Sequence, residues 1–152
     1  MIKKIVIFLT LIFFTASCGF TPIYSNKKNA DFIIKKIVFN GDKTFNNFLR
    51  INLKKYNNPK HSKKFYINSK NDYKKNILSK DSTGKVTNYE LIVKVTFSIS
   101  LNDKKVKEVT FEEKKIMESM DDKFEESRYE ITVKQNFASS ISNKLILELI
   151  SI

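Results

Sequence analysis

The sequence predicts an α+β fold, a two-layer sandwich in which two helices pack on one face of a four-stranded, mostly antiparallel sheet. Apolar and polar residues alternate over residues 89–101, which is typical of a strand with one solvent-facing side. Apolar residues recur every four positions over residues 137–149, which is typical of an amphipathic helix. A strand pattern at 32–39 and a helical pattern at 44–56 precede them. The predicted element order is therefore β-α-β-β-β-α.

The first strand, residues 32–39, is rich in β-branched and aromatic side chains and is expected to be well buried. Asp42 or Thr44 can cap the helix at 44–56, because a side-chain oxygen there accepts hydrogen bonds from the first free amides. One face of this helix is apolar and should face the sheet. Its members are Phe45, Phe48, Leu49, Leu53 and Tyr56.

A long, half-exposed second strand is predicted over residues 63–78, with a polar middle. Its apolar residues share one parity, and they are Phe65, Ile67, Tyr73 and Ile77. A turn at residues 80–85 then leads into the strand at 89–101. Gly84 is the expected positive-φ residue of this turn.

The turn at residues 102–103 leads to a partner strand over 105–117. In that strand Val109 and Phe111 are expected to face the core, while the Glu and Lys residues face solvent. The last helix is expected over residues 122–149, with its apolar stripe on the sheet.

The net charge is +12, and it is concentrated in the first half of the chain. Residues 27–80 hold 15 basic and 3 acidic residues, whereas residues 81–152 hold 11 basic and 13 acidic ones. A basic surface suits nucleic acid, anionic lipid or phosphorylated glycan, and it can also be only a solvated lysine-rich face. Charge alone leaves these alternatives open.

The N-terminus has the three-part layout of an export signal. Lys3 and Lys4 precede an apolar run at residues 5–14, and small residues follow at 15–17. This run is too short for a spanning helix, which needs about 20 residues. The expected organisation is a signal peptide over 1–17, a leader over 18–30 and one α+β domain over 31–152. Export argues against a nucleic-acid partner.

Cys18 follows Thr15-Ala16-Ser17, and this stretch resembles a bacterial lipobox, although Leu is usual in place of Thr15. The resemblance implies an S-diacylglycerol and an N-acyl group on Cys18, with no other cofactor. Two or more acyl chains anchor a protein stably, since each buried CH₂ contributes about 0.8 kcal/mol. Gly19 stands where an Asp would retain such a lipoprotein at the inner membrane, which implies sorting to the outer membrane.

Residues 18–24 read CGFTPIY, which resembles the mature N-terminal signature of the LPS-assembly lipoprotein LptE family, with Ile23 in place of the usual Leu. The order of the elements is also similar to the family fold. The resemblance covers nearly the whole mature chain. It implies an outer-membrane lipoprotein that faces the periplasm and lies within the LptD β-barrel. There it would act as plug and assembly partner in lipopolysaccharide transport to the outer leaflet, and would bind lipopolysaccharide directly.

Lysines in loops at the ends of strands are the candidates for contact with lipopolysaccharide phosphates and carboxylates, or are otherwise only solvated. These candidates are Lys80, Lys85 and Lys123. Three leader residues are expected to contact the membrane interface or the barrel wall, or to pack back on the domain. They are Phe20, Pro22 and Tyr24.

The sequence holds no catalytic or metal-binding motif, and we expect a protein that is not an enzyme. Cys18 has no second cysteine to pair with, and His61, the only histidine, lies in a polar stretch. Glu112 and Glu113 are adjacent on a strand, so they point to opposite faces and are expected to be solvated. The alternatives are a lipid-tethered periplasmic hydrolase and another small outer-membrane lipoprotein, which would be a pilot or accessory subunit of a different envelope complex.

Overall fold

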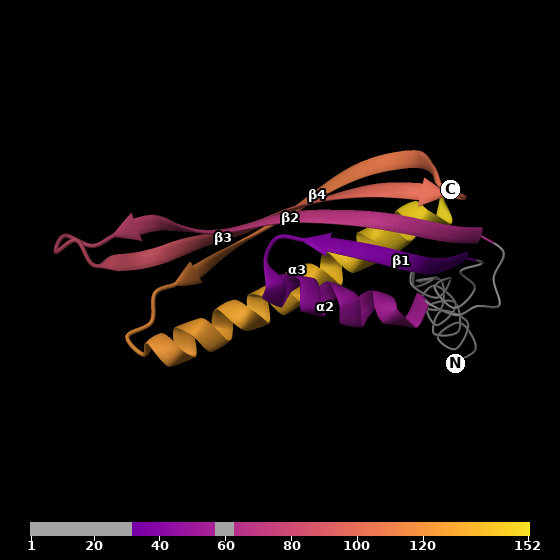
Figure 1. The fold of residues 1–152 in the computed structure, drawn as a ribbon. Helices are drawn as coiled ribbons and strands as arrows, with labels where there is room; N and C mark the ends of the chain where they lie inside the picture. The colour runs from indigo at the N-terminus through magenta and orange to yellow at the C-terminus, as the bar shows by residue number, and fades with distance from the viewer. Residues whose placement is uncertain (1–31, 57–62) are drawn as a thin grey trace, which may run out of the picture. The chain divides into compact units, whose positions relative to one another are not determined.

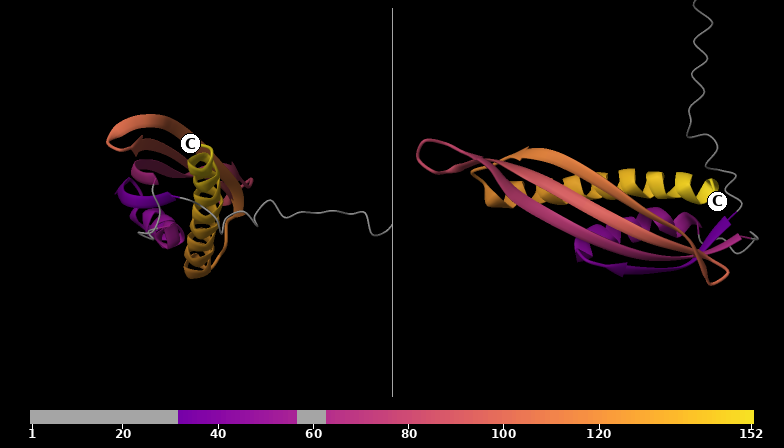
Figure 2. Two further views of the ribbon diagram at one scale, coloured as in Figure 1. Left: turned by 90° about the vertical axis from the view of Figure 1, so that its right-hand side faces the viewer. Right: turned by 90° about the horizontal axis from the view of Figure 1, so that it is seen from above.

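The computed structural model describes residues 32–56 and 63–152, and in this part of the chain two layers are formed (Figure 1). One layer is a sheet of four strands in the order β1-β2-β3-β4, and the other holds two helices on a single face of the sheet (Figure 2). The elements are β1 (Phe32–Asn40), α2 (Lys43–Leu53), the 3₁₀ turn η2 (Lys54–Tyr56), β2 (Lys63–Lys80), β3 (Val86–Leu101), β4 (Lys104–Glu118) and α3 (Lys123–Ile150). This confirms the predicted fold class and element order.

The sheet is mixed, because β1 pairs with β2 in parallel while β2-β3 and β3-β4 are antiparallel. A parallel pair needs a crossover connection, and α2 supplies it. Asp42 caps α2, since its Oδ1 accepts a hydrogen bond from the Phe45 amide at 2.7 Å. Of the two capping residues predicted, Asp42 is therefore the one used. Burial of Phe45, Leu49 and Leu53 confirms the predicted apolar face.

Strand β3 lies in the middle of the core. Its odd-numbered residues Leu91, Val93, Val95, Phe97 and Ile99 are completely buried, as the alternation predicted. They lie under α3, whose buried residues repeat with helical spacing. Those residues include Val133, Phe137, Ile141, Leu145 and Leu149. The two apolar patterns of the sequence therefore meet in one core.

Both predicted hairpin turns are present. Gly84 has φ +85°, as expected for its turn, and Asn102 and Asp103 have φ +49° and +66° between β3 and β4. Such positive φ values at both central residues suit a two-residue hairpin, because they match the twist of the flanking strands.

The burial expected for two strands was partly wrong. Only Phe32, Ile33 and Ile34 of β1 are buried, because β1 is an edge strand that α2 covers incompletely. Ile77 of β2 is 55% exposed. The β2–β3 hairpin runs past the start of α3, so the end of β2 has no helix over it (Figures 1 and 2).

Glu113 corrects a further expectation, since it is not simply solvated. It lies on the helix-facing side of β4 and accepts hydrogen bonds from Ser140 (2.6 Å) and Lys144 (2.7 Å) of α3. Partial burial raises the pKa of its carboxyl, but the bonds from Lys144 and Ser140 outweigh this and lower it. Lys107 also reaches α3, where it pairs with Glu148. These contacts hold the outer strand to the helix.

A buried amide fixes the connection from β1 to α2. Asn71 of β2 donates to the Asn40 carbonyl (3.1 Å) and to Asn46 Oδ1 (2.6 Å), and its own Oδ1 accepts from the Asp42 amide (2.9 Å). Gly41 lies directly against it with φ +113°. A Cβ at Gly41 would lie 2.1 Å from the Asn71 carbonyl oxygen. The connection therefore requires glycine for two reasons, its backbone conformation and this close approach.

We predict that Gly41→Ala lowers the free energy of unfolding by about 3 kcal/mol, because it adds a backbone clash to positive-φ strain. Gly84→Ala is the matched control. It also has positive φ, but no atom lies within 4 Å of its added Cβ, so its cost should be about 1 kcal/mol. Urea unfolding followed by circular dichroism measures both. Equal losses would show that contact with Asn71 is not the constraint.

Candidate functional site

Two of the three lysines predicted from the sequence gather around the β4–α3 connection, at the end of the domain where β2 turns into β3. Lys85, after that turn, places its Nζ 2.6 Å from Asp121 Oδ1. Lys123 opens α3 and donates to the Met120 carbonyl at 2.9 Å. Lys80 is exposed at the end of β2 and forms no ion pair within the described residues. The structure thus brings Lys85 and Lys123 to one connection and leaves Lys80 unpaired.

The pair between Lys85 and Asp121 is open to solvent. Their side chains are 65% and 90% exposed. The hydrogen bond from Lys85 lowers the pKa of Asp121, and Asp121 in turn raises the pKa of Lys85. Exposed pairs of this kind are weak and are screened by salt. An external anion can therefore compete with Asp121 for Lys85.

Lys123 has a different partner, the buried carboxylate of Glu126 at 2.9 Å. Glu126 also accepts from the Met120 amide (3.0 Å) and pairs with Lys75 of β2 (3.0 Å). Burial raises the pKa of Glu126, but the hydrogen bonds from Lys123 and Met120 and the pairing with Lys75 outweigh it and lower the pKa to about 2. Lys123 is thus already engaged within the domain, by Glu126 and by the Met120 carbonyl.

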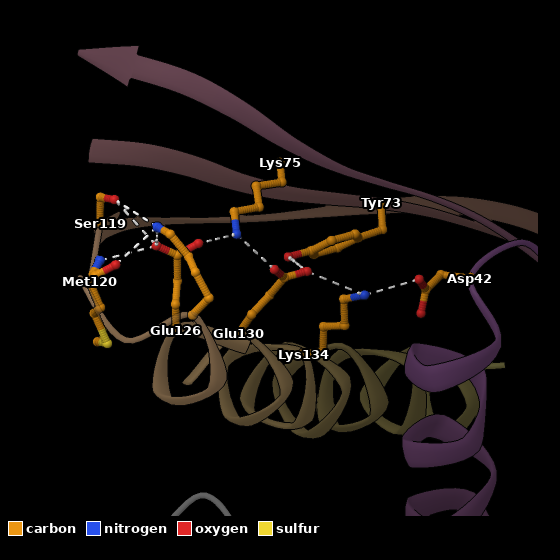
Figure 3. Close-up of polar contacts among 9 residues, drawn as sticks. Asp42, Tyr73, Lys75, Ser119, Met120, Glu126, Glu130 and Lys134 are labelled. Atoms are coloured by element: carbon orange, nitrogen blue, oxygen red, sulfur yellow. Dashed lines mark hydrogen bonds and ion pairs between the residues drawn. The ribbon is translucent and has the colours of Figure 1, made fainter. Parts of the chain in front are cut away.

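Glu126 belongs to a larger set of charged groups between β2, α3 and the start of α2, which we name the polar bridge (Figure 3). Its members are Asp42, Tyr73, Lys75, Glu126, Glu130 and Lys134. Opposite charges alternate along it. Lys75 lies between Glu126 (3.0 Å) and Glu130 (3.1 Å), and Lys134 lies between Glu130 (3.6 Å) and Asp42 (3.0 Å).

Two aromatic rings flank the bridge. The hydroxyl of Tyr73 donates a hydrogen bond to Glu130 (3.0 Å), and the centroid of its ring lies 3.9 Å from Lys134 Nζ. Lys75 Nζ lies 4.3 Å from the ring of Tyr89. Burial and the neighbouring carboxylates, Glu130 first, raise the pKa of Tyr73 far above its ordinary value. Tyr73 therefore stays protonated and acts as a donor, and the bridge is a structural network rather than a set of proton-transfer groups.

Sequence reasoning did not find the polar bridge, although a signal for it was present. Tyr73 and Lys75 share the parity of Phe65 and Ile67, so they had to face the helices. The prediction for this strand was only that it is half-exposed with a polar middle, and it named no partners for the polar side chains. The sequence did not show that Glu126, Glu130 and Lys134 of α3 lie opposite these two side chains in the folded domain.

The leader residues Cys18, Phe20, Pro22 and Tyr24 lie outside the described residues, as do the predicted signal peptide and His61. Within residues 32–56 and 63–152, no group of three or more His, Cys, Asp or Glu side chains is placed to hold a metal ion. Nor is any helix in that part of the chain long and apolar enough to cross a membrane.

Comparison with known proteins gives matches by structure only. No family model and no curated protein matches the sequence. Rare lipoprotein B from Shewanella oneidensis matches with a TM-score of 0.55 and 18% identity, over 76% of this chain and 93% of that one. A minor lipoprotein from Acinetobacter baumannii matches with a TM-score of 0.53 and 16% identity, over 75% of this chain and 94% of that one. The domain thus shares its fold with these bacterial lipoproteins.

We predict that Glu126→Gln lowers the free energy of unfolding at pH 7 by about 2 kcal/mol, because two lysines lose their shared carboxylate. The folded-state pKa of Glu126 is about 2, below its ordinary 4.5. Its stabilisation is therefore complete above about pH 4.5 and is lost as the pH falls through 2. Unfolding curves between pH 2 and 7 should show a smaller acid dependence in the variant than in the native chain.

Glu118→Gln is the control for charge removal, since Glu118 is exposed and forms no ion pair within the described residues. It should leave both the stability and its pH dependence nearly unchanged. If Glu118→Gln and Glu126→Gln behave alike, ionised Glu126 is not the group whose protonation destabilises the domain as the pH falls.

Proposed function

We propose that the chain is an outer-membrane lipoprotein that acts as the plug and assembly partner of an LptD-like β-barrel in lipopolysaccharide transport. One coincidence carries the proposal. A domain with the fold of rare lipoprotein B and the minor lipoprotein follows a cysteine leader, residues 18–24, that has the LptE-like pattern. The fold alone would not support the proposal, because one fold is shared among unrelated functions, and the leader alone is only a short pattern.

The anchor and the domain divide the work in this proposal. Acyl chains on Cys18 hold the N-terminus in the membrane, and Gly19 directs the protein to the outer membrane. The domain then supplies a rigid body to the partner barrel. Its rigidity is supported by the completely buried side chains of β3.

We propose that lipopolysaccharide binds directly at the end of the domain that carries Lys80 and Lys85. Lys80 is exposed and unpaired within the described residues, and Lys85 has only the exposed Asp121 as its partner. Amines with weak internal partners are the ones that can pair with phosphates and carboxylates of a glycolipid. Lys123 contributes less. If its amine paired with a glycolipid anion instead, the buried carboxylate of Glu126 would lose one of its partners.

The proposal is tested by affinity purification from mildly solubilised outer membranes with a C-terminal tag, followed by mass spectrometry of the partners and of the intact bait. Recovery of a large LptD-like barrel with acylated Cys18 supports it. A lipidated bait that brings down a secretion ring or another envelope complex would replace it with a pilot or accessory role. An unlipidated bait without a barrel overturns it.

We predict that Lys80→Ala with Lys85→Ala weakens lipopolysaccharide binding about threefold to tenfold at low salt, and less at high salt because screening already weakens these contacts. Asp121→Asn should strengthen binding, since it frees Lys85 from its internal partner. Binding is measured by titration of lipopolysaccharide at two salt concentrations.

The matched control removes two charges elsewhere, by Lys104→Ala with Lys115→Ala. Both lysines are exposed and unpaired within the described residues, and both lie on β4. An equal loss in this control would show that only total charge matters. A loss of binding in Asp121→Asn would remove Lys85 from the site.

A further inference from the structure

A groove lies between the edge strand β1 and the last turn of α2, away from the lysines discussed above. Its volume is about 360 Å³, within the range of small-molecule sites. Its floor is apolar and is made by Ile34, Ile37, Phe39 and Leu53. Its rim holds four basic residues, Lys35, Lys36, Arg50 and Lys54. The Nζ of Lys35 lies over the Tyr66 ring, 5.7 Å from the ring centroid. Among the residues that the structure describes, none that lines the groove is acidic.

A β-bulge creates the floor. The pairing of β1 with β2 shifts between Ile34 and Lys36, so that Lys35 is the extra residue. After the shift Ile37 pairs with Ile67 and Phe39 with Ser69, whose side chains point to the helix layer. The bulge thus turns Ile37 and Phe39 toward the helices. Both nevertheless remain only half-buried, because α2 covers them only in part.

The rim charges are not neutralised from within. None of the four rim side chains forms an ion pair in the described residues. Arg50 is held over the Phe39 ring at 5.1 Å, and it also donates to Asn47. Asp42 is the only acidic residue between 32 and 56, against six basic ones, and it is already paired with Lys134. By contrast, Lys75 and Lys107 pair with carboxylates of α3, and Lys144 of α3 pairs with Glu113 of β4.

We propose that this groove binds a phosphate-bearing lipid, with an acyl chain on the apolar floor and the phosphate on the basic rim. The groove and such a lipid are complementary. Covering half-exposed Ile37 and Phe39 with an acyl chain is favourable, and the guanidinium of Arg50 with the amines of Lys36 and Lys54 can pair with the phosphate oxygens. The inference rests on the proposed function for its location at a membrane, and it adds a second lipid contact to the domain.

Other occupants fit less well. An added peptide strand would need a regular edge on β1, but the bulge at Lys35 and the two adjacent lysines oppose such pairing. The chain's own leader carries Lys27 and Lys28, so it would add positive charge to a positive rim. A second copy of this chain, with a net charge of +12, has the same sign.

The test uses the full chain with Cys18→Ser, so that no attached acyl group competes for the groove. Dihexanoyl phosphatidic acid, a soluble short-chain probe, is titrated and its binding is measured by calorimetry. Lys36→Gln with Arg50→Gln and Lys54→Gln should weaken binding about tenfold, as expected for three partly exposed charge contacts. Ile37→Ser should also weaken binding of the probe, because it removes apolar contact area from the floor of the groove.

The matched control is Lys94→Gln with Lys104→Gln and Lys115→Gln, which removes the same charge from exposed positions elsewhere. It should bind nearly as the native chain does. Dihexanoyl phosphatidylcholine has the same chains without the net charge, and inorganic phosphate has the charge without the chains. Both should bind at least about tenfold more weakly than the phosphatidic acid probe.

Equal losses in the two triple variants, or equal binding of inorganic phosphate and phosphatidic acid, would overturn the proposal. So would displacement of the probe by a short acidic peptide at similar concentration, which would indicate a protein partner. The outcome is separable from that of the proposed function. Loss of groove binding with the barrel still recovered refutes only this inference, and groove binding without a barrel refutes only the proposed function.

Discussion

The packing of α3 on the sheet depends on charges of opposite sign placed in alternation between β2 and α3. The inward face of β2 begins apolar at Phe65 and Ile67 and becomes polar at Ser69, Asn71, Tyr73 and Lys75. A half-buried lysine is stable there only because carboxylates of α3 meet it at about 3 Å. Removing one partner would leave the other charge desolvated and unpaired. The bridge therefore selects one position of α3 along the strand.

Asp42 connects this bridge to the first half of the domain. One oxygen of its carboxylate caps α2, and the other accepts from Lys134 of α3. Its backbone amide is held by Asn71, against which Gly41 packs. The crossover from β1, the start of α2 and the middle of α3 are thus fixed by neighbouring groups. A cap residue that would be replaceable in an isolated helix is here shared by three elements.

Much of the fold was predictable because its elements follow simple periods. The alternation in β3 and the four-residue spacing in α3 reflect one buried face each, and both were read correctly. The exposure of Phe39 and Ile77 was not predictable, since a strand pattern does not tell an edge from a centre or where a helix layer stops. At the candidate site, sequence reasoning chose Lys85 and Lys123 by their position in loops. It could not tell that Asp121 engages Lys85, because this bond joins residues that only the fold brings together. It overlooked the pair of Lys123 with Glu126, which the i,i+3 spacing on the predicted helix could have indicated.

The uneven composition of the interface under α3 has a dynamic consequence. The first half of the helix faces the sheet mainly through lysine and carboxylate groups, with Val133 buried among them. The second half faces it mainly through Phe137, Ile141, Leu145 and Leu149, with the pairs to Glu113 and Lys107 at the side. Water can replace a carboxylate at a lysine but cannot replace a packed apolar contact. The two halves of this single continuous helix should therefore open with different free energies, the first more easily than the second. We therefore expect hydrogen exchange to show local opening of the N-terminal half before that of the C-terminal half, whose apolar side chains form the larger part of the contact with the sheet.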